Sequence, residues 1–219
     1  MIKIRLWDLP TRLFHWLFAA AVLGAIATDL LDNITWHSYC GYTALVLVVF
    51  RMIWGFVGPH HARFSSFVPS LSGLKAFLKD QTLSPLGHNP LGALSVIAML
   101  LIVLVQATSG LFTDDEISFQ GPLSKFLSED MVKFMNQIHS NNHVLVYGIV
   151  ALHLIAIIYY QKIKKNNLIG PMVYGDKEID SKNQPVDQTS ASKDDVKIRL
   201  LAGALLILLI VIFRYFVIA

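Results

Sequence analysis

Two histidines, His139 and His153, stand fourteen residues apart in one long apolar segment. An α-helix turns about 100° and rises about 1.5 Å per residue. Fourteen residues therefore bring the side chain back to within roughly 40° of its first direction, about 21 Å further along. Histidine is a common axial ligand of haem iron, and ionisable side chains in hydrocarbon are rare unless they are functional. The spacing predicts a membrane helix that ligates two stacked haems.

The composition is that of a membrane protein. Of the 219 residues, 54% are hydrophobic and 15% are charged, whereas soluble domains carry about 25% charged residues. The net charge is only +3 and the basic residues flank apolar segments, which excludes nucleic-acid binding. The single cysteine, Cys40, excludes a disulfide framework, a four-thiolate iron–sulfur site and covalent haem attachment. Any haem is therefore non-covalent and of b type.

Five segments are long enough to cross a bilayer, which takes about 20 apolar residues. They lie at 12–31, 37–57, 90–112, 137–162 and 199–218, and an amphipathic stretch, Pro122–Met135, precedes the fourth. We expect an all-α integral membrane protein with a four-helix transmembrane haem-binding bundle plus a fifth C-terminal transmembrane helix. The corresponding domains are a di-haem cytochrome b domain at 1–175, a polar flexible linker at 176–198 and the additional helix at 199–219.

Lysines and arginines predict the orientation. They are frequent at the N-terminus, in the second loop and after the fourth span, whereas the first turn has none and the third loop is acidic. By the positive-inside rule the N-terminus is cytoplasmic and the C-terminus periplasmic, in a bacterial inner membrane. The alternative, a cleaved secretory signal, is disfavoured because the first apolar run is of spanning length and contains His15.

This orientation sorts the histidines of the spans into two pairs by depth. His37 and His139 fall near the periplasmic side, and His15 and His153 fall near the cytoplasmic side. Each pair offers two imidazoles, which close both axial positions of a haem iron and favour electron transfer over oxygen binding. These four are the predicted metal ligands. His143, one turn after His139, is the alternative ligand, or a contact for a propionate, a quinone or a proton path.

Three further residues are candidate cofactor contacts. Arg51 stands fourteen residues after His37, so it faces the same way at the depth of the inner haem. A propionate contact and snorkelling to lipid phosphates both remain open for it. Arg12, one turn before His15, is a weaker candidate for the same propionate contact. His88, at the start of the third span, lies where an inner haem edge or a quinone headgroup is expected.

Several ordered motifs resemble those of one family. They are Trp7–Trp16, His37 followed by Gly41-Tyr42, Phe50–Gly55, His60-Ala62-Arg63-Phe64 and Leu86–Pro90, together with the histidines of the fourth span. On these residues the chain resembles the bacterial cytochrome b561 family, including the membrane b subunits of nickel–iron hydrogenases, over roughly residues 4–178. The resemblance implies a four-helix bundle around two b haems held by His15, His37, His139 and His153. The linker and the fifth helix depart from the family pattern, which leaves the partner open.

We therefore expect a di-haem b-type cytochrome that transfers electrons across the cytoplasmic membrane between the quinone pool and a redox protein. A periplasmic c-type cytochrome and a hydrogenase are the candidate partners, a quinone is a further candidate cofactor, and a homodimer is left open. Two alternatives remain: a superoxide:quinone oxidoreductase of the same fold, and a mainly structural membrane-anchor subunit of a redox complex.

Overall fold

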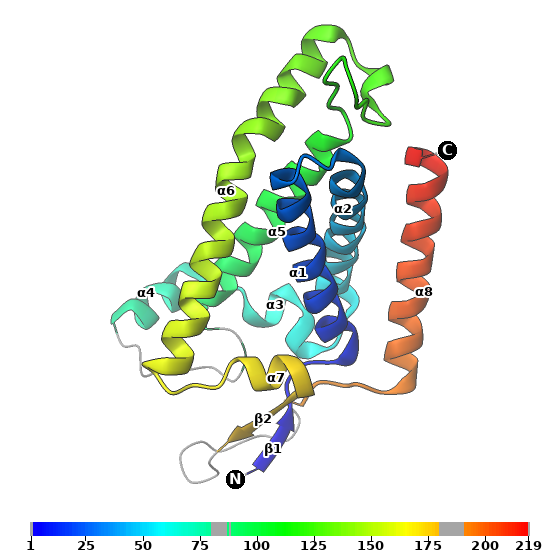
Figure 1. Ribbon diagram of the computed structural model, residues 1–219. Coiled ribbons are helices and arrows are strands. Elements are labelled where there is room, and N and C mark those ends of the chain that lie inside the picture. Colours follow the sequence, from blue (N-terminus) through cyan, green and yellow to red (C-terminus); the bar gives the residue numbers. More distant parts are fainter. Residues whose placement is uncertain (1, 80–86, 88, 180–190, 219) are drawn as a thin grey trace. The chain divides into compact units, whose positions relative to one another are not determined.

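The computed structural model describes residues 2–79, 87, 89–179 and 191–218 (Figure 1). Within this part, five helices are long and apolar enough to cross a membrane. They are α1 (Leu9–Leu30), α2 (Ile34–Val57), α5 (Pro90–Gly110), α6 (Glu129–Lys162) and α8 (Val196–Phe213), which continues as a π-helical segment over Arg214–Ile218. The expected all-α membrane fold with five spans is confirmed. His88 and residues 180–190 of the linker lie outside the described residues.

Four of the five spanning helices begin earlier than the hydropathy pattern predicts, and local interactions explain this for α1 and α6. The Asp8 carboxylate accepts a hydrogen bond of 2.9 Å from the Thr11 backbone N–H, so it caps the first turn of α1 at Leu9. Helix α6 begins at Glu129 with two acidic residues in its first turn, which favourably face the positive end of the helix dipole. The second half of the amphipathic stretch is therefore the first two turns of α6 rather than a separate stretch before that helix.

A two-stranded ribbon joins the N-terminus to the start of the linker. Strand β1 (Ile2–Arg5) pairs antiparallel with β2 (Asp176–Ile179), with Arg5 opposite Asp176. The Arg5 Nε–H donates to Asp176 Oδ1 at 2.6 Å. From their polar composition, residues 176–179 are predicted to belong to a flexible linker. This composition carries no strand signal, and the strand forms because the far end of the chain supplies its partner.

The chain forms two compact units, each assembled from three separate segments. The first unit comprises residues 1–13, 52–97 and 151–202, and the second comprises 14–51, 98–150 and 203–219. The first unit also holds the short elements η1 (His60–Ala62), α3 (Phe64–Phe67), α4 (Leu71–Lys79) and α7 (Ile169–Tyr174). Its centre is Trp54, fully buried, whose indole N–H donates to Asp8 Oδ2 at 3.0 Å.

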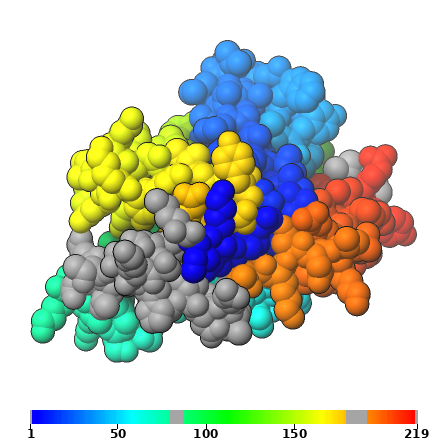
Figure 2. All heavy atoms as spheres, turned by 90° about the horizontal axis from the view of Figure 1, so that it is seen from below, coloured from blue at the N-terminus to red at the C-terminus, as the bar shows by residue number. Residues whose placement is uncertain are grey.

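Asp194 ties the start of α8 to the N-terminal segment within the first unit. Its carboxylate accepts hydrogen bonds from Arg5 Nη1 at 2.8 Å, from Arg199 Nε at 3.0 Å and from the Leu9 backbone N–H at 3.1 Å. The N-terminal residues, blue in Figure 2, lie beside the orange segment that leads into α8. Charge-assisted hydrogen bonds of this kind are stronger than neutral ones, so they fix where the fifth helix begins.

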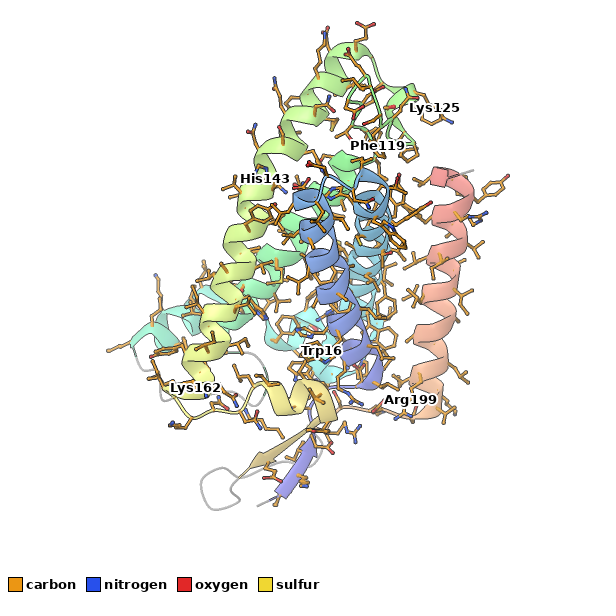
Figure 3. The ribbon with its side chains drawn as sticks, viewed as in Figure 1. Trp16, Phe119, Lys125, His143, Lys162 and Arg199 are labelled. Atoms are coloured by element: carbon orange, nitrogen blue, oxygen red, sulfur yellow. The ribbon has the colours of Figure 1, made fainter. Side chains whose placement is uncertain are left out.

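The second unit is held by apolar packing between helices. Phe14 on α1 packs against Phe50 on α2, with ring centroids 6.5 Å apart. A Cβ at Gly24 on α1 would lie 2.9 Å from Cys40 Sγ on α2, so a larger residue at this crossing would require the Cys40 side chain or the helices to shift. The connection from α5 to α6, which contains Phe119 and Lys125 (Figure 3), includes η2 (Ser124–Phe126) and is closed by a bridge between Asp114 and Gln120.

Candidate functional site

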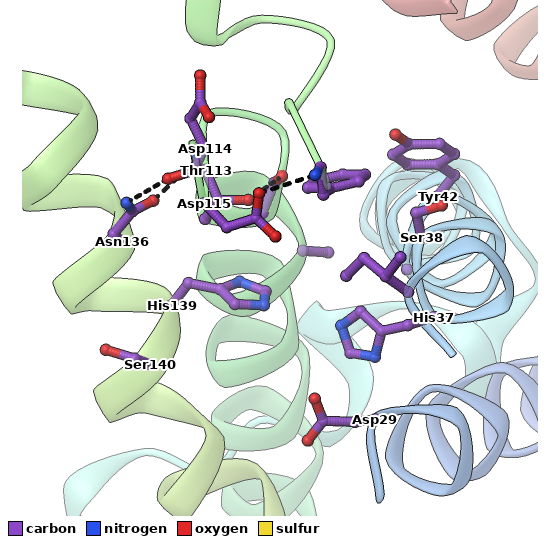
Figure 4. Close-up of a pocket in the computed structure, with 15 residues that line it drawn as sticks. Asp29, His37, Ser38, Tyr42, Thr113, Asp114, Asp115, Asn136, His139 and Ser140 are labelled. Atoms are coloured by element: carbon purple, nitrogen blue, oxygen red, sulfur yellow. Dashed lines mark hydrogen bonds between the residues drawn. The ribbon is translucent and has the colours of Figure 1, made fainter. Parts of the chain in front are cut away.

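His37 and His139 face each other across a pocket of about 260 Å³ in the second unit (Figure 4). Their ring centroids are 6.1 Å apart and their planes meet at 87°. A metal–imidazole nitrogen bond is about 2.0–2.1 Å, so two imidazoles on opposite sides of one metal have ring centroids about 6 Å apart. The two rings therefore have the separation that the axial ligands of a single iron require.

Both imidazoles are anchored through the same ring nitrogen. His37 Nδ1 lies 3.0 Å from the Ala25 carbonyl oxygen on α1, and His139 Nδ1 lies 2.9 Å from the Gln106 carbonyl oxygen on α5. A carbonyl can only accept, so each Nδ1 carries a proton, and in the neutral imidazole each Nε2 then keeps its lone pair. Such an anchor fixes the tautomer and orientation of a metal-binding histidine.

The pocket wall combines small, polar and acidic residues. Fifteen residues line it: Asp29, Ile34, His37, Ser38, Gly41, Tyr42, Ala107, Gly110, Thr113, Asp114, Asp115, Phe119, Asn136, His139 and Ser140. Three of these described lining residues are carboxylates and none is a lysine or arginine. The wall therefore carries negative charge and attracts cations over anions.

Asp115 holds the loop that forms part of the pocket wall. Its carboxylate accepts hydrogen bonds from the backbone N–H groups of Phe119, Ile117 and Ser118 and from the Ser118 hydroxyl, at 2.7–3.0 Å. These bonds, the one from the Phe119 backbone first, hold the pKa of Asp115 well below its ordinary value. Asp115 is therefore ionised at neutral pH.

Two glycines leave room beside the rings. Gly41, one turn after His37 on α2, has no atom within 4 Å of where a Cβ would stand, and it lines the pocket. A Cβ at Gly110 on α5 would lie only 2.9 Å from His139 Cε1. Gly41 leaves open space at the pocket wall, and the His139 ring packs against Gly110. The residues present therefore suit a haem.

His143 has different surroundings from His139. Its Nδ1 donates to the Ser140 carbonyl oxygen on its own helix, and its ring meets Tyr147 edge to face at 5.4 Å. The Tyr147 hydroxyl donates to Asp29 Oδ2 at 3.3 Å. Of these two described histidines, only His139 is among the residues that line the pocket.

The other two predicted ligands lie in different units. His15, on α1, belongs to the second unit and packs edge to face against Trp16 at 4.9 Å. His153, on α6, belongs to the first unit and is half-buried. The pairing of His15 with His153 stays a prediction.

The two arginines differ in their environment. Arg51 is 3% exposed within the second unit, so its charge requires a counter-charge or several acceptors. Arg12, in the first unit, donates from Nη1 to the Val173 carbonyl oxygen at 2.7 Å and lies 4.0 Å from Asp194. A propionate contact would have to share the Arg12 guanidinium with these groups.

Two amides near His139 are not among the candidate residues predicted from the sequence. Gln106, on α5, and Asn142, on α6, hydrogen-bond to each other at 2.9 Å. Gln106 is the only amide side chain in residues 90–112. A polar side chain in an apolar span is costly to bury without a partner, so its isolation in that run was the available signal. Asp29, which lines the pocket, is likewise an isolated acidic residue in an apolar span and could have been found by the same signal.

Among the described residues, no group of three or more His, Cys, Asp and Glu side chains is placed to hold a metal ion. A transition metal held by protein side chains alone usually needs three or four ligands. Two facing imidazoles instead suit a metal whose equatorial ligands come from a macrocycle.

Comparison with known proteins gives one family and several relatives. The family model described as prokaryotic cytochrome b561 matches residues 6–175. The probable Ni/Fe-hydrogenase B-type cytochrome subunit of Azotobacter chroococcum is 25% identical over 211 residues, which cover 78% of this chain and 87% of the relative. The proteins of the same description from Azotobacter vinelandii and Rhizobium leguminosarum are 27% and 26% identical, covering 54% and 56% of their own lengths. No solved structure matches the chain.

Proposed function

Because the chain belongs to the prokaryotic cytochrome b561 family, we propose that it carries electrons across a membrane between the quinone pool and a redox protein. The family match confirms the resemblance derived from the sequence motifs and makes the chain a membrane b-type cytochrome. Haem b supplies one-electron chemistry when bound, while the protein supplies its ligands, its position and the surrounding charge.

The observation that carries the proposal is the facing pair of imidazoles. In the proposal, His37 and His139 are the axial ligands of one haem, because their rings are 6.1 Å apart and both Nδ1 atoms are held by helix carbonyls. His139 is preferred to His143 because it lines the pocket. His15 and His153 hold a second haem in the proposal, and the buried Arg51 contacts a propionate.

The proposed path crosses the membrane. The positive-inside rule places the N-terminus in the cytoplasm and the C-terminus in the periplasm of a bacterial inner membrane. The His37–His139 haem is then on the periplasmic side. A second haem held by His15 and His153 would lie about 20 Å deeper, given the rise of an α-helix over the fourteen residues from His139 to His153.

The charge of the pocket favours a cationic partner over an anionic substrate. Asp29, Asp114 and Asp115 line the pocket, and no lysine or arginine is among the described lining residues. Such a surface repels superoxide, which argues against the superoxide:quinone oxidoreductase alternative. The named relatives are described as hydrogenase subunits, so a hydrogenase is the first candidate partner and a periplasmic c-type cytochrome is the second.

Haem stoichiometry tests the ligation. A reduced-minus-oxidised spectrum of the purified full chain, with pyridine haemochrome quantitation, is expected to give two b haems per chain. His153→Ala is expected to remove one haem and to keep the other. A single haem in the wild-type chain would overturn the two-pair assignment. The absence of haem would overturn electron transfer and return the chain to the anchor-subunit alternative.

Reduction kinetics test the direction and the partner. Quinol is expected to reduce the haems in membranes, and the electrons are expected to pass on to the partner when it is added. With a cationic partner, the rate is expected to fall as ionic strength rises, because salt screens long-range attraction. Haems that quinol does not reduce would exclude the quinone link. A rate independent of salt would exclude the acidic pocket as the docking surface.

A further inference from the structure

The His139 ring is contacted on several sides by a single residue of the neighbouring helix. Gln106 accepts the His139 Nδ1 proton with its backbone carbonyl at 2.9 Å. Its side-chain Nε2 lies 3.1 Å from the His139 carbonyl oxygen and 3.3 Å from His139 Nε2. A rotation of the imidazole would break the contacts at both ring nitrogens at once.

Asn142 determines which end of the Gln106 amide faces the histidine. The Asn142 Nδ2 donates to Gln106 Oε1 at 2.9 Å and to the Ile102 carbonyl oxygen at 3.0 Å. An amide whose oxygen accepts from Asn142 must turn its NH₂ group to His139. Asn142 is 9% exposed, and a buried amide that loses its partner pays the full cost of desolvation. The reverse orientation would place two acceptors, Gln106 Oε1 and the His139 carbonyl oxygen, side by side.

The orientation of this amide selects one tautomer of His139. Its NH₂ group is a donor, so the ring nitrogen that faces it must carry a lone pair, and that nitrogen is Nε2. The Gln106 carbonyl independently requires the proton on Nδ1. Ser109, which is buried, supports that carbonyl by donating its hydroxyl proton to it at 3.0 Å. Two separate contacts therefore favour the tautomer in which Nε2 is the Lewis base.

We propose that Gln106 and Asn142 are positioning residues that lock His139 in its Nδ1–H tautomer and fix the plane of its ring for axial ligation. This inference rests on the proposed function, in which His139 ligates a haem. The contact between Gln106 Nε2 and His139 Nε2 is the longer of the two amide contacts, so a metal that takes the Nε2 lone pair displaces only the weaker one. The bonds to the His139 carbonyl oxygen and to Asn142 remain.

Two single variants and one exchange test the proposal on the haem-loaded full chain. Gln106→Leu and Asn142→Leu remove the amide pair but keep the Gln106 backbone carbonyl. The double variant Gln106→Asn/Asn142→Gln keeps one long and one short amide. Asn141→Leu is the matched control, because Asn141 is the exposed neighbour of Asn142 on the same helix.

The readouts are the rate of haem transfer to apomyoglobin and the EPR spectrum of the ferric chain, which reports the orientation of the imidazole planes. Loss of a partner that orients a metal ligand typically costs about 10–100-fold in affinity. We therefore expect each single variant to release the His37–His139 haem about 10–100-fold faster and to shift its EPR signal. We expect Asn141→Leu to change neither, and the double variant to restore both in part.

His139→Ala distinguishes a failure of the proposed haem ligation from a failure of the positioning role alone. If His139→Ala retains both haems, the proposed ligation is wrong and this inference falls with it. If His139→Ala loses one haem while both single variants keep the wild-type EPR signal and release rate, ligation stands and the positioning role is overturned. If the single variants fail to fold, the double variant decides. A shifted EPR signal with an intact fold and no change in the control supports the role, and an unshifted signal overturns it.

Discussion

Gly110 on α5 lies directly against the His139 ring on α6. A Cβ at this position would stand 2.9 Å from His139 Cε1 and 3.2 Å from Nδ1, which is closer than packed side chains tolerate. The ring can keep its 2.9 Å bond to the Gln106 carbonyl oxygen only because residue 110 has no side chain. The α5–α6 crossing therefore sets the position of His139 with backbone atoms as well as with side chains.

Gly110→Ala is expected to displace the His139 ring without unfolding the chain, since alanine is a better helix former than glycine. The displaced ring should release the His37–His139 haem about 10–100-fold faster, as for other losses of ligand orientation. Haem transfer to apomyoglobin measures the rate. Gly203→Ala on α8, where nothing lies within 4 Å of the Cβ position, should leave it unchanged. Equal rates in both variants would show that the close contact is unimportant.

Gly41→Leu is expected to block the pocket. No atom lies within 4 Å of a Cβ at this lining position, so leucine can be accommodated and would occupy the space proposed for the macrocycle. The haem content should fall from two to one per chain, measured as pyridine haemochrome. Gly203→Leu provides the control for adding a leucine at an equally open helical glycine. Two haems retained in Gly41→Leu would place the macrocycle elsewhere.

Replacing His139 or His143 by alanine, one at a time, distinguishes the two candidate ligands on α6. His139→Ala should lose one haem, because the His139 side chain lines the pocket opposite His37. His143→Ala should keep both haems, since His143 is not among the described residues that line the pocket. Haem stoichiometry and the reduced-minus-oxidised spectrum report the outcome. The opposite pattern would make His143 the ligand.

The Asp115 loop is expected to loosen in acid. The pKa of Asp115 is lowered from its ordinary 3.8, so its contribution is fully present above that pH and is lost as the pH falls through the lowered value. At pH 7, Asp115→Asn should raise the hydrogen-exchange rates of the amides of residues 117–119 several-fold. The difference between variant and wild type should shrink once the wild-type carboxyl is protonated. Glu116→Gln is the control, and an equal increase there would show that charge alone matters.

Asp194→Asn is expected to weaken the attachment of α8. Burial alone would raise the pKa of Asp194, but hydrogen bonds from Arg199 and the Leu9 backbone outweigh it and lower that pKa below 3.8. The stabilisation is therefore present above pH 3.8 and lost in acid. Removing the charge should cost about 1.5–3 kcal/mol, the usual contribution of a hydrogen bond to a charged group. Thermal unfolding measures it. Glu178→Gln breaks an exposed ion pair with Lys3 and should cost far less.

The sequence by itself determined the spans, the family and the histidine spacing. Hydropathy over about 20 residues and a 14-residue interval are properties of one helix at a time, so they can be derived from the order of residues alone. The sequence motifs include Gly41, four residues after His37. They do not distinguish close helix packing from room for a macrocycle at this position, because both need a missing side chain.

Only the tertiary structure decided which atoms meet. His37 and His139 are brought to 6.1 Å by the packing of α2 and α6, and the amide that fixes the tautomer of His139 comes from α5. β1 finds its partner strand more than 170 residues away, and Asp194 reaches back to Arg5 and Leu9. These contacts join segments far apart in the sequence. They depend on the relative rotation and depth of whole helices, which the periodicity of a single helix does not specify.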